Sequence, residues 1–396
     1  MKKALLALSI VTGLLSTSAS AEIRINGFAS ITAGMTLDDG DTLFGYNDEF
    51  SLKPESLFAL QVSADLQEKL SATAQIIARG ENDFDAEFEW AYITYELTEN
   101  TQLSAGKMRI PFYRYSDFLD VGYAYRWIRP PQSVYNLSFS TYEGLSLLHN
   151  STLGEWDSSL QLMFGAVDDD IAAVSSSDAA KLNDTLGFNW TLSKDWFSAR
   201  AAYFISEATI DLSNSAQLSA LIGGLNGFGL TEQASNLAID EDDAYFAAIG
   251  FSIDYEDILV DAEYTEFEVD NSILAKQQQY YVSLGYRIDE WTLSLTYEDN
   301  DDDNDASEFN TVPTSITTQL GPIPVSTNPT DPNAPLLRDL TNFALASQSA
   351  ADNSYSVGAR YNFHPAAAFK VDFTQVDYEI SDTKTEILSI GVDIVF

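Results

Sequence analysis

A cluster of basic residues lies between positions 107 and 129 of an otherwise acidic chain. Five cations share this segment with only two acids. The cations are Lys107, Arg109, Arg114, Arg126 and Arg129, and the acids are Asp117 and Asp120. The whole chain has 396 residues and a formal charge of −40. An even distribution would place about one basic residue in a segment of this length, so the cluster indicates a site.

Arginine and lysine side chains around a narrow, low-dielectric opening raise the local concentration of anions. A guanidinium group also donates two parallel hydrogen bonds to a carboxylate or phosphate. Four tyrosines of the same segment would add hydroxyl donors or a stacking surface: Tyr113, Tyr115, Tyr123 and Tyr125. If the segment lines a pore, this composition predicts a preference for anions or carboxylated solutes.

Other kinds of site have little support in the sequence. The excess of acids disfavours nucleic-acid binding. There is no cysteine, and the two histidines, His149 and His364, lie near no strained G-x-S-x-G nucleophile turn, so no enzyme activity is expected. The acidic runs at 168–170, 241–243 and 298–305 have oxygen ligands for divalent cations, but no calcium-loop spacing, and we interpret them as solvated loop tips. We predict no cofactor and no metal.

The elements that must position the basic cluster are β-strands. Apolar and polar residues alternate in segments of about ten, each closed by turn residues, which is typical of transmembrane β-strands. In the last segment, Leu388, Ile390, Val392, Ile394 and Phe396 share one face. The sequence predicts sixteen strands, at 23–36, 56–66, 70–79, 86–97, 101–110, 143–150, 156–166, 182–192, 196–210, 243–255, 257–268, 277–288, 291–299, 352–363, 368–379 and 384–396.

The connections alternate between tight turns and long loops, which predicts an antiparallel up-and-down transmembrane β-barrel. Sixteen strands give a lumen wide enough for water. Eighteen strands are the alternative, because the long acidic and Pro-rich external loop at about 300–350 has room for a further hairpin between 311 and 347. Its six prolines favour irregular structure instead.

The alternation also places other cations. Six basic residues on predicted strands fall on the polar face and should line the lumen: Arg24, Arg79, Arg200, Arg287, Arg360 and Lys370. Lys107 and Arg109 share the parity of Leu103 and Ala105, which should face lipid. Either a bulge precedes the loop or this placement is wrong.

A second interpretation of the basic cluster stays open. Buried or partly buried cations need partners, so the arginines would pair with acids of the barrel wall, such as Asp261, Glu263 or Asp372, and fix the loop in place. The same residues then stabilise the loop without attracting anions.

The first 21 residues predict an export signal, with Lys2 and Lys3 before an apolar core and Ala19-Ser20-Ala21 as the cleavage site. The mature chain would begin near Glu22.

The signal peptide, the opening strand from Ile23 to Phe28, the repeated alternation and the terminal Phe396 together resemble Gram-negative outer-membrane porins over essentially the whole mature chain. Gly106-Lys107 matches a Gly-Arg pair that general porins often carry before the third loop. The basic, aromatic composition of the loop is more similar to that of anion-preferring porins.

The resemblance implies a homotrimer whose third external loop, at about 111–142, folds into the barrel and narrows it. It also implies passive diffusion of small hydrophilic solutes and ions, contact with outer-membrane lipid and lipopolysaccharide, and recognition of Phe396 by the barrel-assembly machinery. Two rival functions remain: a non-conducting adhesin or structural barrel, and an outer-membrane hydrolase.

Overall fold

A computed structural model describes residues 22–137, 139–171, 178–304, 311–319 and 321–396. The export signal expected at 1–21 lies outside the described residues.

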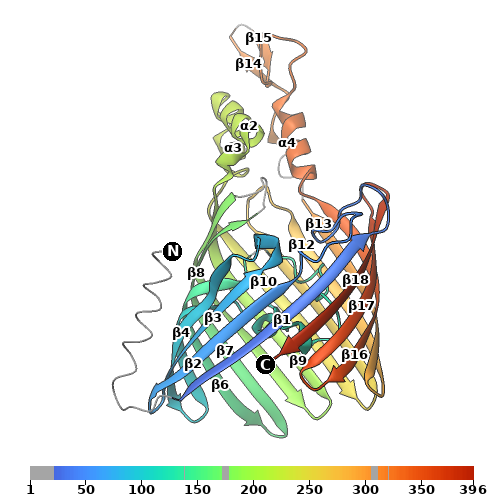
Figure 1. Cartoon of the computed structure of the whole chain (residues 1–396). Helices are drawn as coiled ribbons and strands as arrows, with labels where there is room; N and C mark the ends of the chain where they lie inside the picture. The colour runs from blue at the N-terminus through green and yellow to red at the C-terminus, as the bar shows by residue number, and fades with distance from the viewer. Residues whose placement is uncertain (1–21, 138, 172–177, 305–310, 320) are drawn as a thin grey trace, which may run out of the picture.

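Sixteen strands form one closed antiparallel barrel within this part of the chain (Figure 1). Each strand pairs with its sequence neighbour, except that β13 pairs with β16, and β1 closes the barrel against β18. The strands are β1 (Ile23–Thr36), β2 (Leu57–Gln67), β3 (Leu70–Arg79), β4 (Ala86–Thr98), β5 (Thr101–Arg109), β6 (Thr141–Leu153), β7 (Trp156–Ile171), β8 (Asp178–Lys194), β9 (Phe197–Ile210), β10 (Ile239–Tyr255), β11 (Ile258–Val269), β12 (Lys276–Ile288), β13 (Trp291–Asp303), β16 (Ala350–His364), β17 (Ala367–Tyr378) and β18 (Thr383–Val395).

The sixteen-strand prediction is confirmed. A hairpin does form in the Pro-rich connection, from β14 (Ser315–Thr318) and β15 (Gly321–Pro324), but it is a separate two-stranded sheet and not part of the barrel. The connections also contain helices: η2 (Gly80–Asn82), η3 (Ser116–Phe118), η4 (Gly122–Ala124), η5 (Leu212–Asn214), α2 (Ala216–Gly227), α3 (Thr231–Ser235) and α4 (Leu337–Ala346). No helix in the described ranges is long and apolar enough to cross a membrane.

The outer surface of the barrel is apolar because alternate residues of each strand point outward. On β13, Leu293 and Leu295 are about half exposed, while the inward Thr292, Ser294 and Thr296 are buried. Exposed Trp156, Trp196, Tyr255, Trp291 and Phe363 surround the end with short turns, and Tyr264, Tyr280 and Tyr355 lie nearer the other end. Such aromatic belts mark the two interfaces of a lipid bilayer.

The predicted acidic loop tips are instead the ends of strands. Asp168 and Asp169 belong to β7, and Glu241–Asp243 belong to β10. The residues from Glu298 through Asp303 form the end of β13. Pairing continues there because the ladder needs only backbone groups, although the apolar alternation that marks the bilayer has ended.

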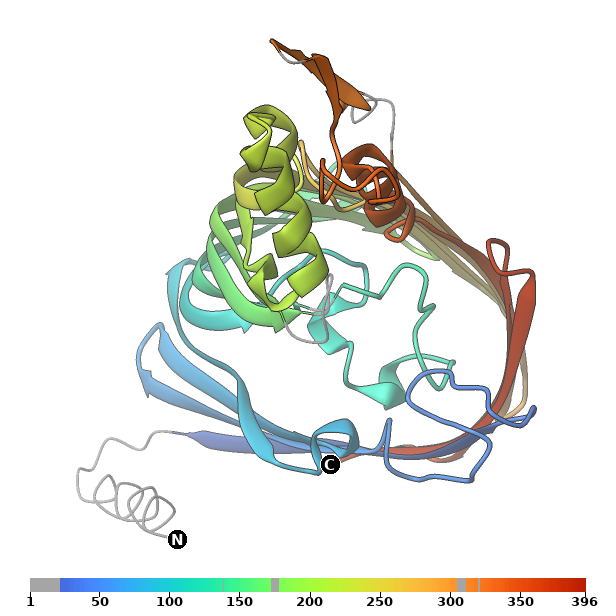
Figure 2. The ribbon, with the colours of Figure 1, turned by 90° about the horizontal axis from the view of Figure 1, so that it is seen from above.

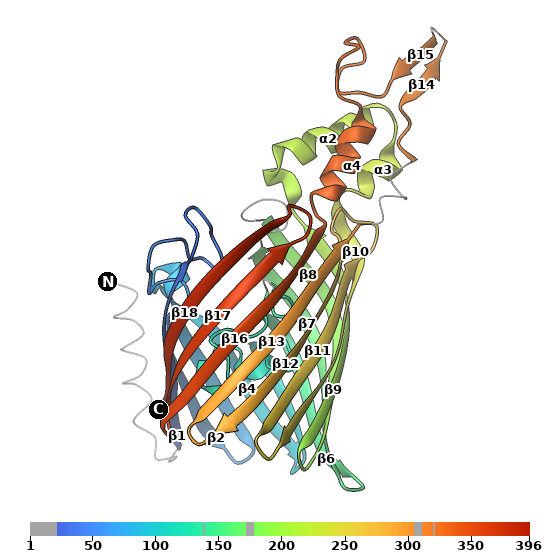
Figure 3. The same cartoon turned by 90° about the vertical axis from the view of Figure 1, so that its right-hand side faces the viewer.

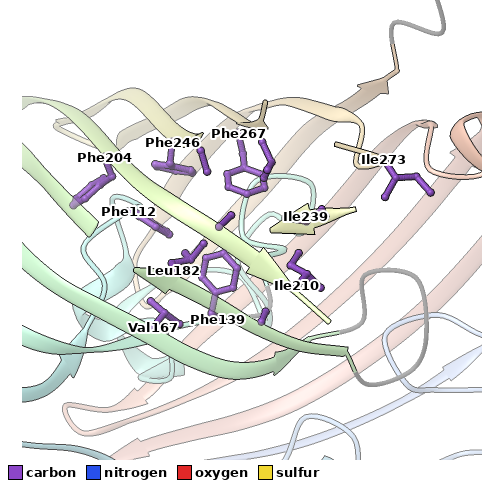
Figure 4. Packing of buried hydrophobic residues seen from close by; sticks show 14 of the residues in the cluster. Phe112, Phe139, Val167, Leu182, Phe204, Ile210, Ile239, Phe246, Phe267 and Ile273 are labelled. Atoms are coloured by element: carbon purple, nitrogen blue, oxygen red, sulfur yellow. The ribbon is translucent and has the colours of Figure 1, made fainter. Parts of the chain in front are cut away.

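Two connections form a helical layer above the barrel (Figure 3). Leu218, Leu221 and Leu225 of α2 are buried together with Leu337 and Leu345 of α4. Figure 4 shows how the same apolar cluster continues down through Ile239 and Ile210 to Phe246 and Phe112. The layer is therefore packed onto the long-loop ends of β8 to β11.

The chain between β5 and β6 lies inside the barrel, where Figure 2 shows it crossing the opening. We call residues 110–140 the inner loop. Its ends are joined by a backbone hydrogen bond of 2.9 Å from the Ile110 amide to the Ser140 carbonyl. The predicted folding of the third external loop into the pore is thus observed.

Barrel closure depends on a close approach at Gly27. The Gly27 amide donates to the Phe396 carbonyl at 2.7 Å, and the Phe396 amide donates back at 2.9 Å. The Phe396 ring stacks on Phe58 with a centroid distance of 5.9 Å. A Cβ atom on Gly27 would lie 2.4 Å from this ring and 2.9 Å from the Ala59 carbonyl oxygen.

We therefore predict that Gly27→Ala lowers the free energy of unfolding by about 1–3 kcal/mol, the usual cost of overpacking. Gly391→Ala, in the paired strand, is the control, because the nearest atom to its new Cβ would be the Thr32 hydroxyl oxygen at 3.2 Å, with no backbone atom closer than 3.5 Å. Urea unfolding in lipid vesicles measures both variants. Equal stability of the two variants would contradict the role assigned to the Gly27 contact.

Candidate functional site

The first part of the inner loop is held by aromatic packing and by Arg200. Phe112 stacks on Phe246 of β10 at 4.4 Å and meets Phe204 of β9 edge-on at 5.0 Å. The buried guanidinium of Arg200 donates to the carbonyls of Pro111 and Tyr113. Arg200 thus lies on the predicted inner face, where it binds the loop backbone.

The middle of the inner loop is held by two acids of β11. Arg126 forms a buried ion pair with Asp261 and stacks on Trp127 at 4.3 Å. The Tyr115 hydroxyl donates to Asp261 at 2.8 Å, and burial, then the Asp261 charge, raise the pKa of Tyr115 above its usual range. The hydroxyl therefore stays a donor.

The second β11 acid, Glu263, accepts from the Arg114 amide at 2.8 Å and from the Tyr135 hydroxyl at 2.6 Å. Hydroxyl groups on the next two strands also hold the loop. The Trp127 indole donates to Thr296 of β13 at 2.9 Å and to Ser283 of β12 at 3.1 Å. The loop thus binds the wall through carboxylates and hydroxyls on adjacent strands.

The later part of the loop reaches β17 and β18. The Ile128 amide donates to Asp372 at 2.6 Å, and Lys370, which is fully buried, pairs with Asp393 at 2.8 Å while donating to the Gly122 carbonyl at 2.7 Å. Lys370 therefore serves as a bridge between wall and loop.

Arg129 binds the loop that precedes β2. Its Nε and Nη2 atoms both donate to Glu55 at 2.7 Å, and Nη2 also donates to Ser389 at 2.7 Å. The guanidinium lies 4.6 Å from the centre of the Phe44 ring. Two external connections are thus tied together through one arginine.

A four-residue charge network lies where β3, β4 and β5 meet the loop. Arg79 pairs with Glu89 at 2.9 Å and with Asp120 at 3.2 Å, and Arg109 pairs with Glu89 at 3.0 Å and also with Asp120. Burial opposes ionisation of Asp120, but Arg109 and then Arg79 outweigh it, so the pKa of this carboxyl is lowered. The two arginines are therefore neutralised by these two acids, and Arg79 also pairs with the more exposed Glu87 at 3.0 Å.

Lys107 is not part of this network. It pairs across the sheet with Ala91 and Glu143, on the face that carries the exposed Leu145, and its Nζ donates to the Phe88 carbonyl at 3.3 Å. Arg109 has the same parity, yet it lies past the last β4–β5 pair, Ala91–Lys107, and its side chain pairs inward with Glu89 and Asp120. Two backbone irregularities lie next to this place in the sheet. Gly106 has a positive φ of 139°, and the β3–β4 pairing shifts its register.

Three of the predicted residues, Asp117, Arg114 and Arg200, form no ion pair with a described residue. Asp117 is exposed. Arg114 is half-buried and donates to Ser198 at 3.1 Å. Neither arginine has a carboxylate within ion-pair distance among the described residues, although the charge of Glu263 acts on both.

The remaining predicted lumen cations are on inward faces. Arg24 pairs with Asp65 at 2.9 Å and Arg287 with Asp254 at 2.6 Å, both near the short-turn end. Arg360 donates to the Tyr125 carbonyl at 2.8 Å and lies 4.7 Å from the Tyr123 ring centre. Arg360 thus binds the loop as Arg200 does.

The inner loop covers one half of the inner wall. Ser283, Thr296, Lys370 and Ser389 of β12 to β18 are at most 1% exposed. Beside the charge network of Arg79, Glu89 and Arg109, strands β2 to β7 also carry inward neutral residues that remain half-buried: Gln61, Ser63, Thr73, Thr94, Ser104 and Gln161. They hydrogen-bond across the wall, as Thr94 and Ser104 do at 2.8 Å. Apart from the paired charges of that network, this side of the lumen is therefore lined by neutral polar groups.

Comparison with known proteins agrees with this architecture. A profile of the Gram-negative porins matches residues 4–322. The chain belongs to this family. No curated protein sequence shows significant similarity to it.

Solved structures resemble the porin in fold. The outer membrane channel DcaP of Acinetobacter baumannii has a TM-score of 0.58 at 13% identity, over 96% of this chain and 99% of that chain. An anion-selective porin from Comamonas acidovorans has a TM-score of 0.58 at 10% identity, over 95% and 100%. The trimer form of OmpT, an outer membrane protein of Vibrio cholerae, has a TM-score of 0.53 at 10% identity, over 95% and 99%.

The porin is therefore an outer-membrane channel protein, and its family points away from an enzyme. His149 contacts Thr101 at 2.9 Å, and His364 accepts from the Ala366 amide at 3.1 Å in a tight turn. Neither forms a hydrogen bond with the inner loop.

Sequence reasoning missed four acids that bind the inner loop or its wall partners: Glu55, Glu89, Glu298 and Asp393. Glu55 lies in an irregular connection with no periodic pattern, and Glu89 lies where the β3–β4 register shifts. A carboxylate within a strand otherwise lined by apolar and aromatic residues was the one available signal for Glu89.

We predict that Asp261→Asn destabilises the porin by about 3–5 kcal/mol, because it leaves the buried Arg126 unpaired. Asp254→Asn removes the partner of the more exposed Arg287 and should cost less than about 1 kcal/mol. Urea unfolding compares the two variants. If Asp261→Asn were no worse than Asp254→Asn, the ion pair would not be what holds the loop.

Proposed function

We propose that the porin forms a water-filled channel for passive diffusion of small hydrophilic solutes, with a weak preference for anions or carboxylated solutes at the inner loop. The division of the lumen carries this proposal. One half is filled by the inner loop, and the other half is lined by half-buried amides and hydroxyls that can hydrogen-bond to a passing solute.

The preference is weak because most cations of the loop are already paired. Arg109, Arg126 and Arg129 each have a carboxylate partner. Arg114 and Arg200 have none among the described residues, and Arg114 is the more accessible of the two. A half-buried, unpaired guanidinium lowers the local free energy of an anion.

We predict that Arg114→Gln reduces the anion-to-cation permeability ratio by roughly threefold, the effect of one unit charge about 10 Å away at an intermediate dielectric constant. Reversal potentials in a salt gradient across a planar bilayer measure the ratio. Arg114→Lys, which keeps the charge at the same position, is the control and should leave the ratio unchanged. A ratio unchanged by Arg114→Gln would refute the anion preference, and a folded barrel that never conducts would favour the structural-barrel alternative.

We further propose that the porin is a homotrimer in contact with outer-membrane lipid and lipopolysaccharide, that Phe396 is read by the barrel-assembly machinery, and that residues 1–21 are a cleaved signal. The trimer form of the Vibrio cholerae protein supports the first of these. The exposure of Phe396, 57%, leaves its ring partly accessible on the outer surface.

We predict that native mass spectrometry of the porin, purified from a Gram-negative outer membrane, gives three times the mass of a chain that starts at Glu22. Apolar contact between barrels would hold the trimer together. A monomer in several mild detergents would contradict the assembly, and a mass that includes residues 1–21 would contradict the cleavage.

A further inference from the structure

The outer face of the barrel changes character on β5 and β6. Two cross-strand rows of outward residues are apolar there, Leu103–Leu147 and Ala105–Leu145. They lie between two polar rows, Thr101–His149 on the short-turn side and Lys107–Glu143 on the long-loop side. We call the outward residues of these four rows the short-band face.

The apolar band is wider on other strands. On β12 and β13 four apolar rows face outward, from Ile288–Trp291 to Val282–Tyr297. The six steps from Thr101 to Lys107 on β5 span about 15 Å along the membrane normal, at about 3.3 Å per residue and a tilt of about 40°. The apolar band of a membrane barrel is about 25 Å tall. The two polar rows of the short-band face therefore cannot both lie at the bilayer surfaces.

The adjoining turn shows which row lies inside the band. Thr101 directly follows the tight turn of Glu99 and Asn100 between β4 and β5. A turn with open backbone groups does not lie in hydrocarbon, so Thr101 is at the short-turn surface of the bilayer. The Lys107–Glu143 row is then inside the apolar band, where charges that face lipid are costly.

Neither charge of this row is neutralised by the described chain. Glu143 is exposed and forms no ion pair or hydrogen bond with a described residue. Lys107 has one hydrogen bond among these residues, from Nζ to the Phe88 carbonyl at 3.3 Å, although an ammonium group can donate three. Even an ion pair between the two side chains would have to leave water on a wall that faces lipid, at a cost to both charges. Lipid is therefore a poor neighbour for this row.

The surroundings also differ from those of a lipid-facing wall. No outward position of β5 or β6 holds Trp, Tyr or Phe, so the aromatic belts are interrupted. The Lys107–Glu143 row continues through Ala91 of β4 and Ala74 of β3, which places small side chains beside the charges. Small side chains let two proteins approach closely within a membrane.

We infer that a second copy of the chain covers the short-band face, and that Lys107 of each subunit pairs with Glu143 of the partner subunit. The two charges are adjacent on one face, so a threefold rotation brings them together between neighbours if that face lies close to the axis. Lysines and glutamates then alternate around the axis, and the apolar rows pack between the subunits. The inference rests on the proposed homotrimer and names its contact surface.

The first test reverses each charge singly. Lys107→Glu leaves two acids on the face and Glu143→Lys leaves two bases, so each contact around the axis becomes repulsive. Each variant should raise the dissociation constant of the trimer at least about tenfold, the effect of losing one charge-assisted hydrogen bond. Native mass spectrometry over a dilution series measures this constant, and circular dichroism shows that each barrel is folded.

Mixing the two variants separates contact between subunits from pairing within one barrel. When the two are refolded together, the chain with two acids meets the chain with two bases, and attractive contacts outnumber repulsive ones in a mixed trimer. The charges within each chain stay alike, so pairing within one barrel predicts no recovery. We expect mixed trimers at concentrations where neither variant alone forms a trimer.

Lys107→Met tests the face without introducing a repulsion, and it decides the question if a charge-reversed variant does not fold. Removing the charge would stabilise a wall that faces lipid, whereas in a subunit contact it leaves Glu143 of the partner subunit unpaired. We expect a dissociation constant raised about tenfold. Glu155→Lys is the control, because it creates a like-charge contact with Lys194 in the exposed turn between β6 and β7 and should leave the constant unchanged.

Each other outcome overturns the inference. If Lys107→Met and the charge-reversed variants are as trimeric as the unaltered chain, the trimer uses another face and the homotrimer stands. If the variants lose the trimer and the mixture does not regain it, the two charges act within one barrel. If the unaltered porin is a monomer, the proposed homotrimer fails together with the inference.

Discussion

The buried arginines of the inner loop stay inside the barrel only if carboxylates neutralise them, and much of the interior follows from this requirement. Leaving one partner of such a pair unpaired costs about 3–5 kcal/mol. Arg126 is therefore found at Asp261, Arg129 at Glu55, and Arg109 at Asp120 and Glu89. The loop lies where these acids are.

This pairing divides the lumen. The acids that hold the middle and the end of the loop, Asp261, Glu263 and Asp372, are on β11 and β17, so the loop packs against that half of the wall. Apart from the paired Arg79, Glu89 and Arg109, the opposite half carries amides and hydroxyls, which need no counter-charge and can remain in contact with water. The same arrangement that stabilises the loop thus keeps a passage beside it.

The barrel was predictable from the sequence because its signal is local and repeated. Alternation fixes which side chains face lipid, and tight turns fix where strands end, so β1 and β3 were predicted with their observed bounds. The signal fades where the bilayer ends, and β7 accordingly continues to Ile171, past its predicted end. The packed helices α2 and α4 were not predicted, since their leucines are buried only against each other and the strand ends.

The candidate site was predictable in composition but not in pairing. The cluster of cations and the possibility of wall partners such as Asp261 were visible in the sequence. The pairing of Arg129 with Glu55 was not, because Glu55 is distant from Arg129 in the sequence and lies in an irregular connection. Lys107 shows most clearly what the sequence could not predict. Which face of the barrel its side chain occupies depends on the strand register, and Gly106 and the β3–β4 register shift alter that register locally.

Paired charges also bear on selectivity. An ion pair has almost no net charge at a distance, so an interior rich in arginine exerts a weaker field than its composition suggests. What a solute meets in the lumen is then short-range: a single unpaired guanidinium, a single free carboxylate, or a row of amides. Selection in such a channel depends on where the few uncompensated groups lie relative to one another, and the excess of acids outside the barrel affects mainly how often a charged solute arrives.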